Sequence, residues 1–66
     1  MRSTWDIHFT VEGKLDIFKN GELVHRSVPL VWLERQLDLY GISGDDYKNV
    51  VHQLSDTGKA SVRTHF

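Results

Sequence analysis

The sequence predicts a two-layer α+β domain in which two helices cover one face of a four-stranded antiparallel sheet. Apolar and polar residues alternate through the first 28 residues, which is the two-residue period of half-buried strands. Between residues 30 and 54 the apolar residues recur at helical spacing, and alternation returns near the end. Strands and helices segregated in the order β-β-β-α-α-β are typical of an α+β fold. We expect the strand order 3-2-1-4, with the fourth strand beside the third as the alternative.

The first half of the chain is expected to form three strands. The first covers residues 5–11, where four apolar residues alternate with polar ones. A turn at Glu12-Gly13 leads to the second strand, which ends at Asn20-Gly21. This dipeptide is a strong hairpin signal because both central residues of a type I′ turn have positive φ. The third strand follows from Glu22 to about Val28.

The turns also predict the register of the two hairpins. Asn20-Gly21 sets four pairs opposite one another, namely Lys19 with Glu22, Phe18 with Leu23, Ile17 with Val24, and Asp16 with His25. A two-residue turn at Glu12-Gly13 would place Phe9 opposite Asp16 and mix the faces. We therefore expect a three-residue connection or a bulge, which places Val11 opposite Leu15 and Phe9 opposite Ile17.

Two helices and a strand are expected in the second half. Pro29 marks the first helix because proline suits the first helical position and Gly41 provides a C-terminal stop. Ser43 is the expected N-cap of the second helix, and two carboxylates follow it at the positive end of the helix dipole. Residues 56–58 end this helix. The alternation of the fourth strand breaks only at Thr64.

Length and composition restrict the class of protein. The 66 residues leave room for a single domain over residues 1–66. Such a domain buries only about 60% of the surface of its unfolded chain, and small domains often gain stability by oligomerising. The absence of cysteine excludes a disulfide scaffold, a thiol enzyme and a cysteine-based zinc site. With no apolar run of ~20 residues and no signal-like start, we expect a cytoplasmic protein that does not enter a membrane.

The expected core draws on every strand and helix. It consists of Trp5, Ile7, Phe9, Val11, Leu15, Ile17, Val24, Val28, Leu30, Leu33, Leu37, Tyr40, Ile42, Tyr47, Val50, Val51, Leu54, Ala60, Val62 and Phe66. Trp32 and Leu39 lie away from the core stripe of the first helix and, being seven residues apart, share one face. They either pack against the second helix or meet a partner.

A second group of apolar residues outside the core is expected on the sheet. Phe18 and Leu23 pair on the face away from the helices, flanked by His8 and His25. They form either an ordinary cross-strand pair or part of a partner-binding surface, because clustered exposed apolar groups mark contact surfaces.

Two histidines and a carboxylate share the outer sheet face in this register. His8, Asp16 and His25 would make a three-ligand metal site, but spacing across strands is no metal signature. We expect instead a polar face with a His-Asp pair, and no metal. The sequence has no nucleophile elbow, Walker motif or dinucleotide fingerprint, so we expect no enzyme, no cofactor and no small-molecule substrate.

Residues 4–40 offer a second functional interpretation. Three strands followed by a helix resemble in outline the small DNA-reading domains that lay a three-stranded sheet into the major groove, such as the plant ethylene-response type and the arm-binding domains of integrases. That resemblance implies nucleic-acid binding by the outer sheet face. The net charge of −1 predicts that such binding would be weak, because Lys14 and Arg63 stand against Asp6 and Asp16 there.

The leftover apolar residues predict a non-enzymatic protein-interaction module that self-associates as a homodimer, with weak nucleic-acid binding as the alternative. The expected partner-binding residues are Phe18, Leu23, Trp32, Leu39, His8 and His25.

Overall fold

A computed structural model describes residues 2–65 of the chain. Its element order is β-β-β-α-α-β, as predicted, with a short 3-10 turn before the first helix. The elements are β1 (Ser3–Phe9), β2 (Leu15–Lys19), β3 (Glu22–Val28), η1 (Leu30–Trp32), α1 (Leu33–Leu39), α2 (Gly44–Thr57) and β4 (Lys59–Thr64). The four strands form one antiparallel sheet in the order β3-β2-β1-β4, which confirms the predicted topology.

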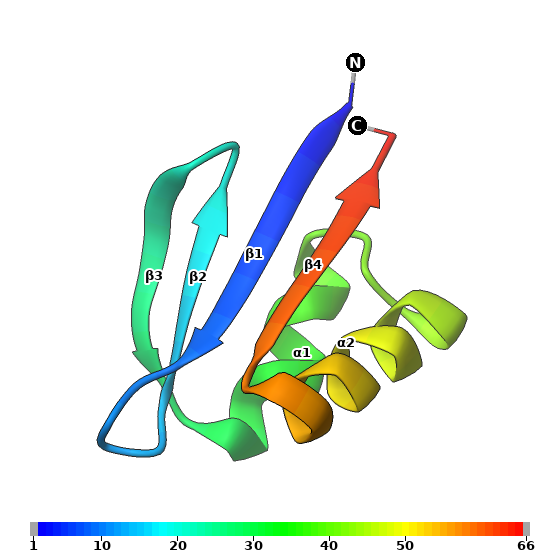
Figure 1. Cartoon of the computed structure of the whole chain (residues 1–66). Coiled ribbons are helices and arrows are strands. Elements are labelled where there is room, and N and C mark those ends of the chain that lie inside the picture. Colours follow the sequence, from blue (N-terminus) through cyan, green and yellow to red (C-terminus); the bar gives the residue numbers. More distant parts are fainter. Residues whose placement is uncertain (1, 66) are drawn as a thin grey trace.

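The helices cover only part of the sheet. Figure 1 shows α1 and α2 on the same side of it, with β3 standing at the far left beyond both helices. α2 packs mainly on β4 and also on β1. All residues of β3 before Val28 are exposed. The helices therefore cover the β3 edge of the sheet less fully than its centre, although His25 of β3 contacts Gln36 of α1.

The first hairpin differs from the expected register by two residues. Phe9 pairs with Leu15, so the expected pairs of Val11 with Leu15 and of Phe9 with Ile17 are wrong. The amide of Thr10 donates to the carbonyl of Lys14 at 2.8 Å and closes a three-residue loop. A three-residue connection was the right prediction, but it begins one residue earlier than expected. A shift of two residues keeps each side chain on its face, so the apolar face of β1 survives the correction.

The second hairpin follows the prediction at its turn and departs from it further along β3. Asn20 and Gly21 both have positive φ, and Phe18 pairs with Leu23 as predicted. A bulge then skips Val24, so Ile17 pairs with His25 instead of Val24 and the expected pairing of Asp16 with His25 is wrong.

A second irregularity in β3 lies between His25 and Val28, because Val28 pairs with Leu15. Ser27 has a φ of 57°, an unusual value for a residue other than glycine. Its amide donates to Oδ1 of Asp16 at 3.0 Å. This hydrogen bond from β3 to Asp16 of β2 therefore connects the two strands where their regular pairing is interrupted.

The helical half confirms two helices and corrects how they begin. Pro29 precedes η1 in an extended conformation, so α1 starts four residues later than expected. Ser43 occupies the N-cap of α2 without a side-chain hydrogen bond to it, contrary to the expected cap. Gly58 ends α2 in the left-handed conformation, with φ of 78°, and its amide donates to the carbonyl of Leu54.

The core lies between the sheet and the helices. Its buried members are Trp5, Ile7, Leu15, Ile17, Val28, Leu33, Leu37, Ile42, Val50, Leu54 and Ala60, with Tyr40, Tyr47 and Val62 packed against them. Five residues expected in the core are exposed, namely Phe9, Val11, Val24, Leu30 and Val51. Val11 lies in the hairpin loop and Val24 at the bulge, where their strands no longer follow regular pairing. Phe66 falls outside the described residues.

Trp5 contacts both the end of α1 and strand β4. Its ring stacks on Tyr40 with centroids 4.2 Å apart, and its Nε1 donates to Oγ1 of Thr64 at 3.0 Å. Thr64 is buried on the helix side of β4, which explains why the alternation of that strand breaks there. A buried indole N–H requires an acceptor, and a threonine hydroxyl supplies one where an apolar residue would not.

Candidate functional site

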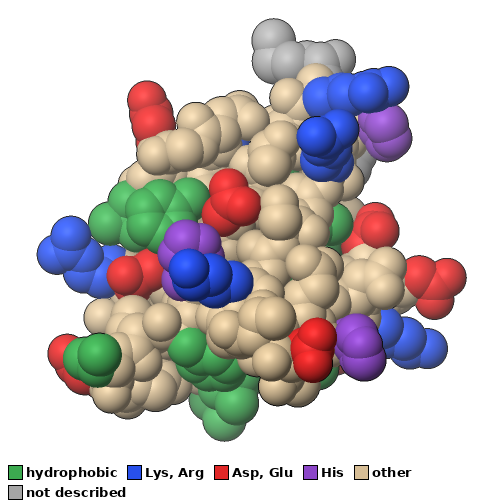
Figure 2. Space-filling view, in the orientation of Figure 1, with side chains coloured by type: hydrophobic (Ala, Val, Ile, Leu, Met, Phe, Trp, Pro, Cys, Tyr) green, Lys and Arg blue, Asp and Glu red, His purple; other side chains and the backbone are tan. Residues whose placement is uncertain are grey.

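The outer face of the sheet brings Phe18, Leu23 and His8 together. Phe18 pairs with Leu23 across β2 and β3, and the His8 ring lies 5.3 Å from the Phe18 ring between centroids. Phe18 is half-buried and Leu23 is exposed. Figure 2 shows this face, with a hydrophobic patch on the left over β2 and β3 beside histidine and charged side chains. The apolar part of this face is small.

His25 lies on the opposite face from His8. Because the bulge at Val24 pairs His25 with Ile17, His25 faces the helix side of the sheet. There its Nε2 lies 3.1 Å from Nε2 of Gln36, and its ring is 6.0 Å from that of Tyr40. The expected flanking of Phe18 and Leu23 by His25 is therefore wrong. His8 and Asp16 are cross-strand partners, but His25 does not join them in a metal site.

The outer face carries charges of both signs. Lys59 lies opposite His8 and Arg63 lies opposite Thr4, while Asp6 and Asp16 supply carboxylates on the same face. Among residues 2–65 no three histidine or carboxylate side chains gather as a metal site would require. A mixed face of this kind lacks the excess of positive charge on which nucleic-acid binding depends.

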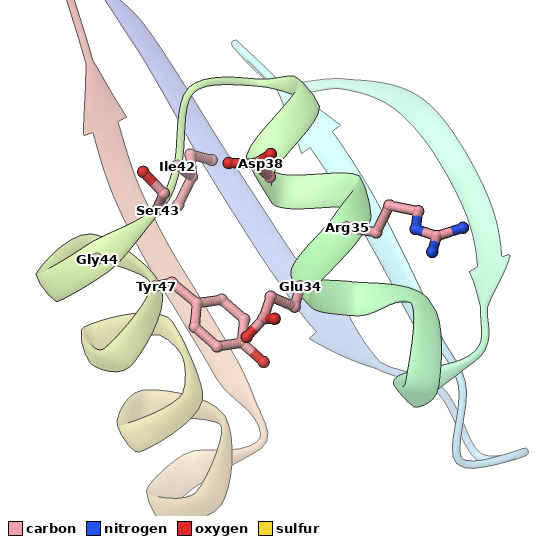
Figure 3. Close-up of a pocket in the computed structure, with 7 residues that line it drawn as sticks. All are labelled: Glu34, Arg35, Asp38, Ile42, Ser43, Gly44 and Tyr47. Carbon is pink, nitrogen blue, oxygen red and sulfur yellow. The ribbon is translucent and has the colours of Figure 1, made fainter.

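Trp32 and Leu39 are both exposed, with 51% and 74% of their surface accessible. Neither is buried, so packing within the fold leaves much of both side chains uncovered. The Arg35 guanidinium lies 5.4 Å from the Trp32 ring centroid, and Figure 3 shows Arg35 pointing away from α2 toward β3. We call this side of η1 and α1, formed by Trp32, Arg35 and Leu39, the Trp32 flank.

A groove that the sequence did not predict lies between the two helices. Its volume is about 260 Å³ and it opens between η1–α1 and α2 near the end of β1. We call it the helix groove; its apolar lining consists of Phe9, Leu30, Leu33, Tyr47, Val51 and Leu54. The exposed Phe9, Leu30 and Val51 were expected in the core. Helical spacing predicts a common face for such residues, but not whether another element covers it.

The two rims of the helix groove differ in charge. On the α1 side, Glu34, Asp38 and Arg35 line a hollow of about 460 Å³ together with Tyr47 and the start of α2, and the Arg35 guanidinium points away from α2 (Figure 3). Figure 3 shows both carboxylates on the side of α1 that faces α2. On the α2 side, Lys48 lines an adjoining hollow with Val51 and is the cation there. We call the side with Glu34 and Asp38 the acidic rim and the side with Lys48 the basic rim; the apolar groove lies between them.

The edges of the sheet are unsuited to adding another strand. Gln53 of α2 donates from Nε2 to the carbonyl of Ser61 at 3.2 Å, and its Oε1 accepts from the amide of Ser61 at 3.1 Å. The Thr57 hydroxyl bonds the amide and the carbonyl of Lys59. These side chains occupy backbone groups that a strand beside β4 would need. At the other edge the bulges interrupt β3, and irregular strands discourage pairing.

No protein-family model, curated protein or solved structure matches the chain. The class that is established is therefore a fold class, a small α+β domain with a four-stranded antiparallel sheet. Among the described residues, none of the helices is long and apolar enough to span a membrane.

Proposed function

We propose that this chain is a non-enzymatic protein-interaction module that self-associates through apolar side chains left uncovered by its own fold. The observation that carries the proposal is the exposure of η1. All three of its residues, Leu30, Val31 and Trp32, are large and apolar, and none is buried. A contiguous apolar turn at the surface is typical of contact sites, whereas single exposed apolar residues are ordinary.

The surface around η1 is larger than the apolar pair on the outer face. Leu30 continues into the helix groove, and Trp32 continues into the Trp32 flank. An aromatic side chain buries about 150–250 Å² in a contact, so a half-exposed Trp32 offers roughly 100 Å². At 25 cal/mol per Å² this burial is worth about 2.5 kcal/mol. Phe18 and Leu23 remain a smaller, second contact candidate.

Self-association is tested by sedimentation equilibrium over a wide concentration range. We expect the average mass of the wild-type chain to rise above that of the monomer with concentration. The double substitution Leu30→Ser and Trp32→Ser should weaken association at least tenfold, because it removes two apolar contacts worth about 1.4 kcal/mol or more together. Circular dichroism should show an unchanged fold, since η1 contributes no buried residue.

Val11→Ser is the matched control. Val11 is fully exposed in the β1–β2 loop, so this substitution removes an apolar group far from η1 in the sequence. It should leave association unchanged. A wild-type chain that stays monomeric at every concentration would contradict self-association. Association that survives the double substitution would contradict the role of η1.

A further inference from the structure

The charges around the helix groove indicate what could bind there more specifically than those of the other uncovered surfaces do. The Trp32 flank offers one cation, Arg35, with no matching acidic surface nearby on α1 that faces the same way. The outer face mixes charges, and the sheet edges are capped or bulged. Within residues 2–65, the groove is the one surface of these that combines an apolar lining with an acidic rim and a basic rim.

The opposite rims make the groove self-complementary. A two-fold axis that runs along the groove turns one copy over onto the other, so that α1 of each copy lies on α2 of the other. Each acidic rim then meets a basic rim, twice in the same dimer. A two-fold interface requires this property, because the same patch must complement itself.

The positions of Glu34 and Lys48 along the groove also suit such a dimer. Figure 3 shows the Tyr47 ring beside Glu34, and Lys48 follows Tyr47 in α2, so both charged residues lie near Tyr47. Rotation about an axis along the groove preserves their position along it. Glu34 of one copy therefore lies near Lys48 of the other, and the exposed Leu30 lies near Val51 of the other copy.

The chain has enough surface for this contact. A standard interface buries roughly 800 Å² on each partner. The accessible surface of the chain is 4666 Å², so this contact would occupy about one sixth of it. Apolar residues at the centre with charges at the border have the usual anatomy of an interface.

We propose that a second copy of this chain docks on the helix groove about a two-fold axis along it, with Glu34 of each copy against Lys48 of the other. This proposal rests on the proposed function, since it assigns the self-association to the part of the η1 surface where Leu30 continues into the helix groove. The contact pairs α1 with α2 between copies, and it buries the exposed residues Phe9, Leu30 and Val51.

The test is a charge exchange between variants. Glu34→Lys and Lys48→Glu each place like charges together at both symmetric contacts, so each should raise the dissociation constant of the dimer about tenfold or more. An equimolar mixture of the two variants restores both attractive pairs in the heterodimer. We expect that mixture to dimerise within about threefold of the wild-type dissociation constant. Nitrogen-15 labelling of one variant lets native mass spectrometry separate the heterodimer from either homodimer.

Glu12→Lys and Lys59→Glu are the matched controls, because they make the same charge changes in the β1–β2 loop and on the outer face. Both should dimerise as the wild type does. A wild-type chain that never dimerises would overturn this proposal and the proposed self-association together. A wild-type dimer with unaffected single variants, a mixture that fails to recover, or controls that weaken equally would overturn the groove alone.

Discussion

Gln53 is a side chain whose loss should change both stability and assembly. Its amide makes two hydrogen bonds to the outward backbone of Ser61, at 3.1 and 3.2 Å, and so occupies the place of a neighbouring strand. Gln53→Met keeps the length and the helix propensity of the side chain but removes both bonds. Each bond contributes about 0.5–1.5 kcal/mol net, and water replaces part of this at an exposed site. We expect a loss of about 1–2 kcal/mol.

The assays are urea denaturation and thermal denaturation, with sedimentation velocity on the same samples. In a domain of 60–100 residues each kcal/mol lowers Tm by about 4–8 °C, so Tm should fall by roughly 4–16 °C. The opened β4 edge should also produce assemblies larger than those of the wild-type chain, because unpaired edge groups accept another strand. Gln53→Glu retains the acceptor for the Ser61 amide but sets a carboxylate oxygen against the Ser61 carbonyl, so it should lose at least as much stability as Gln53→Met.

Gln53→Ala separates edge opening from added apolar surface, since it should also assemble but adds no apolar length. The reasoning is refuted by a Gln53→Met variant that unfolds at the wild-type urea concentration and sediments as the wild type does.

Three further substitutions test the core and the bulge. Leu37→Ala should cost about 2–5 kcal/mol in urea denaturation because Leu37 is fully buried; a cost below 1 kcal/mol would contradict that packing. Trp5→Phe should cost at least about 1 kcal/mol by leaving the Thr64 hydroxyl without its donor, and a double-mutant cycle with Thr64→Val should show positive coupling rather than additivity. Asp16→Ala should cost about 1 kcal/mol and speed hydrogen exchange at the Ser27 amide; unchanged exchange would argue against the Asp16 contact.

The order of elements and of strands could be predicted because local signals and global topology agree. Alternation identified the strands, and Asn20-Gly21 fixed the second hairpin at its turn. The register beyond Leu23 could not be predicted, because its causes are tertiary. Asp16 binds the Ser27 amide from a neighbouring strand, and His25 lies against Gln36 of α1. Neither contact is visible in the alternation of β3.

The candidate surfaces were predicted in part, for a related reason. Spacing alone singled out Trp32 and Leu39 as residues outside the core stripe, and both are exposed. Spacing also assigned Leu30 and Val51 to the core, but both are exposed. Their burial depends on whether another element covers them, which spacing does not show. α1 is seven residues long and α2 lies mainly on β4, so the helices leave a groove between them. That gap depends on how far apart the sheet holds the helices.

Pairing of β1 with β4 brings Ser3 opposite Thr64, so both ends of the described fold leave the sheet at one corner (Figure 1). A short peptide linking these ends would span little distance, and new ends opened at Asn20-Gly21 would cut only a surface turn. Such a rearranged chain keeps every strand neighbour, and its new ends lie at the same end of the sheet as the old ones, because Asn20 hydrogen-bonds Thr4 of β1. The domain thereby lends itself to insertion in a loop of a host protein, held at both ends.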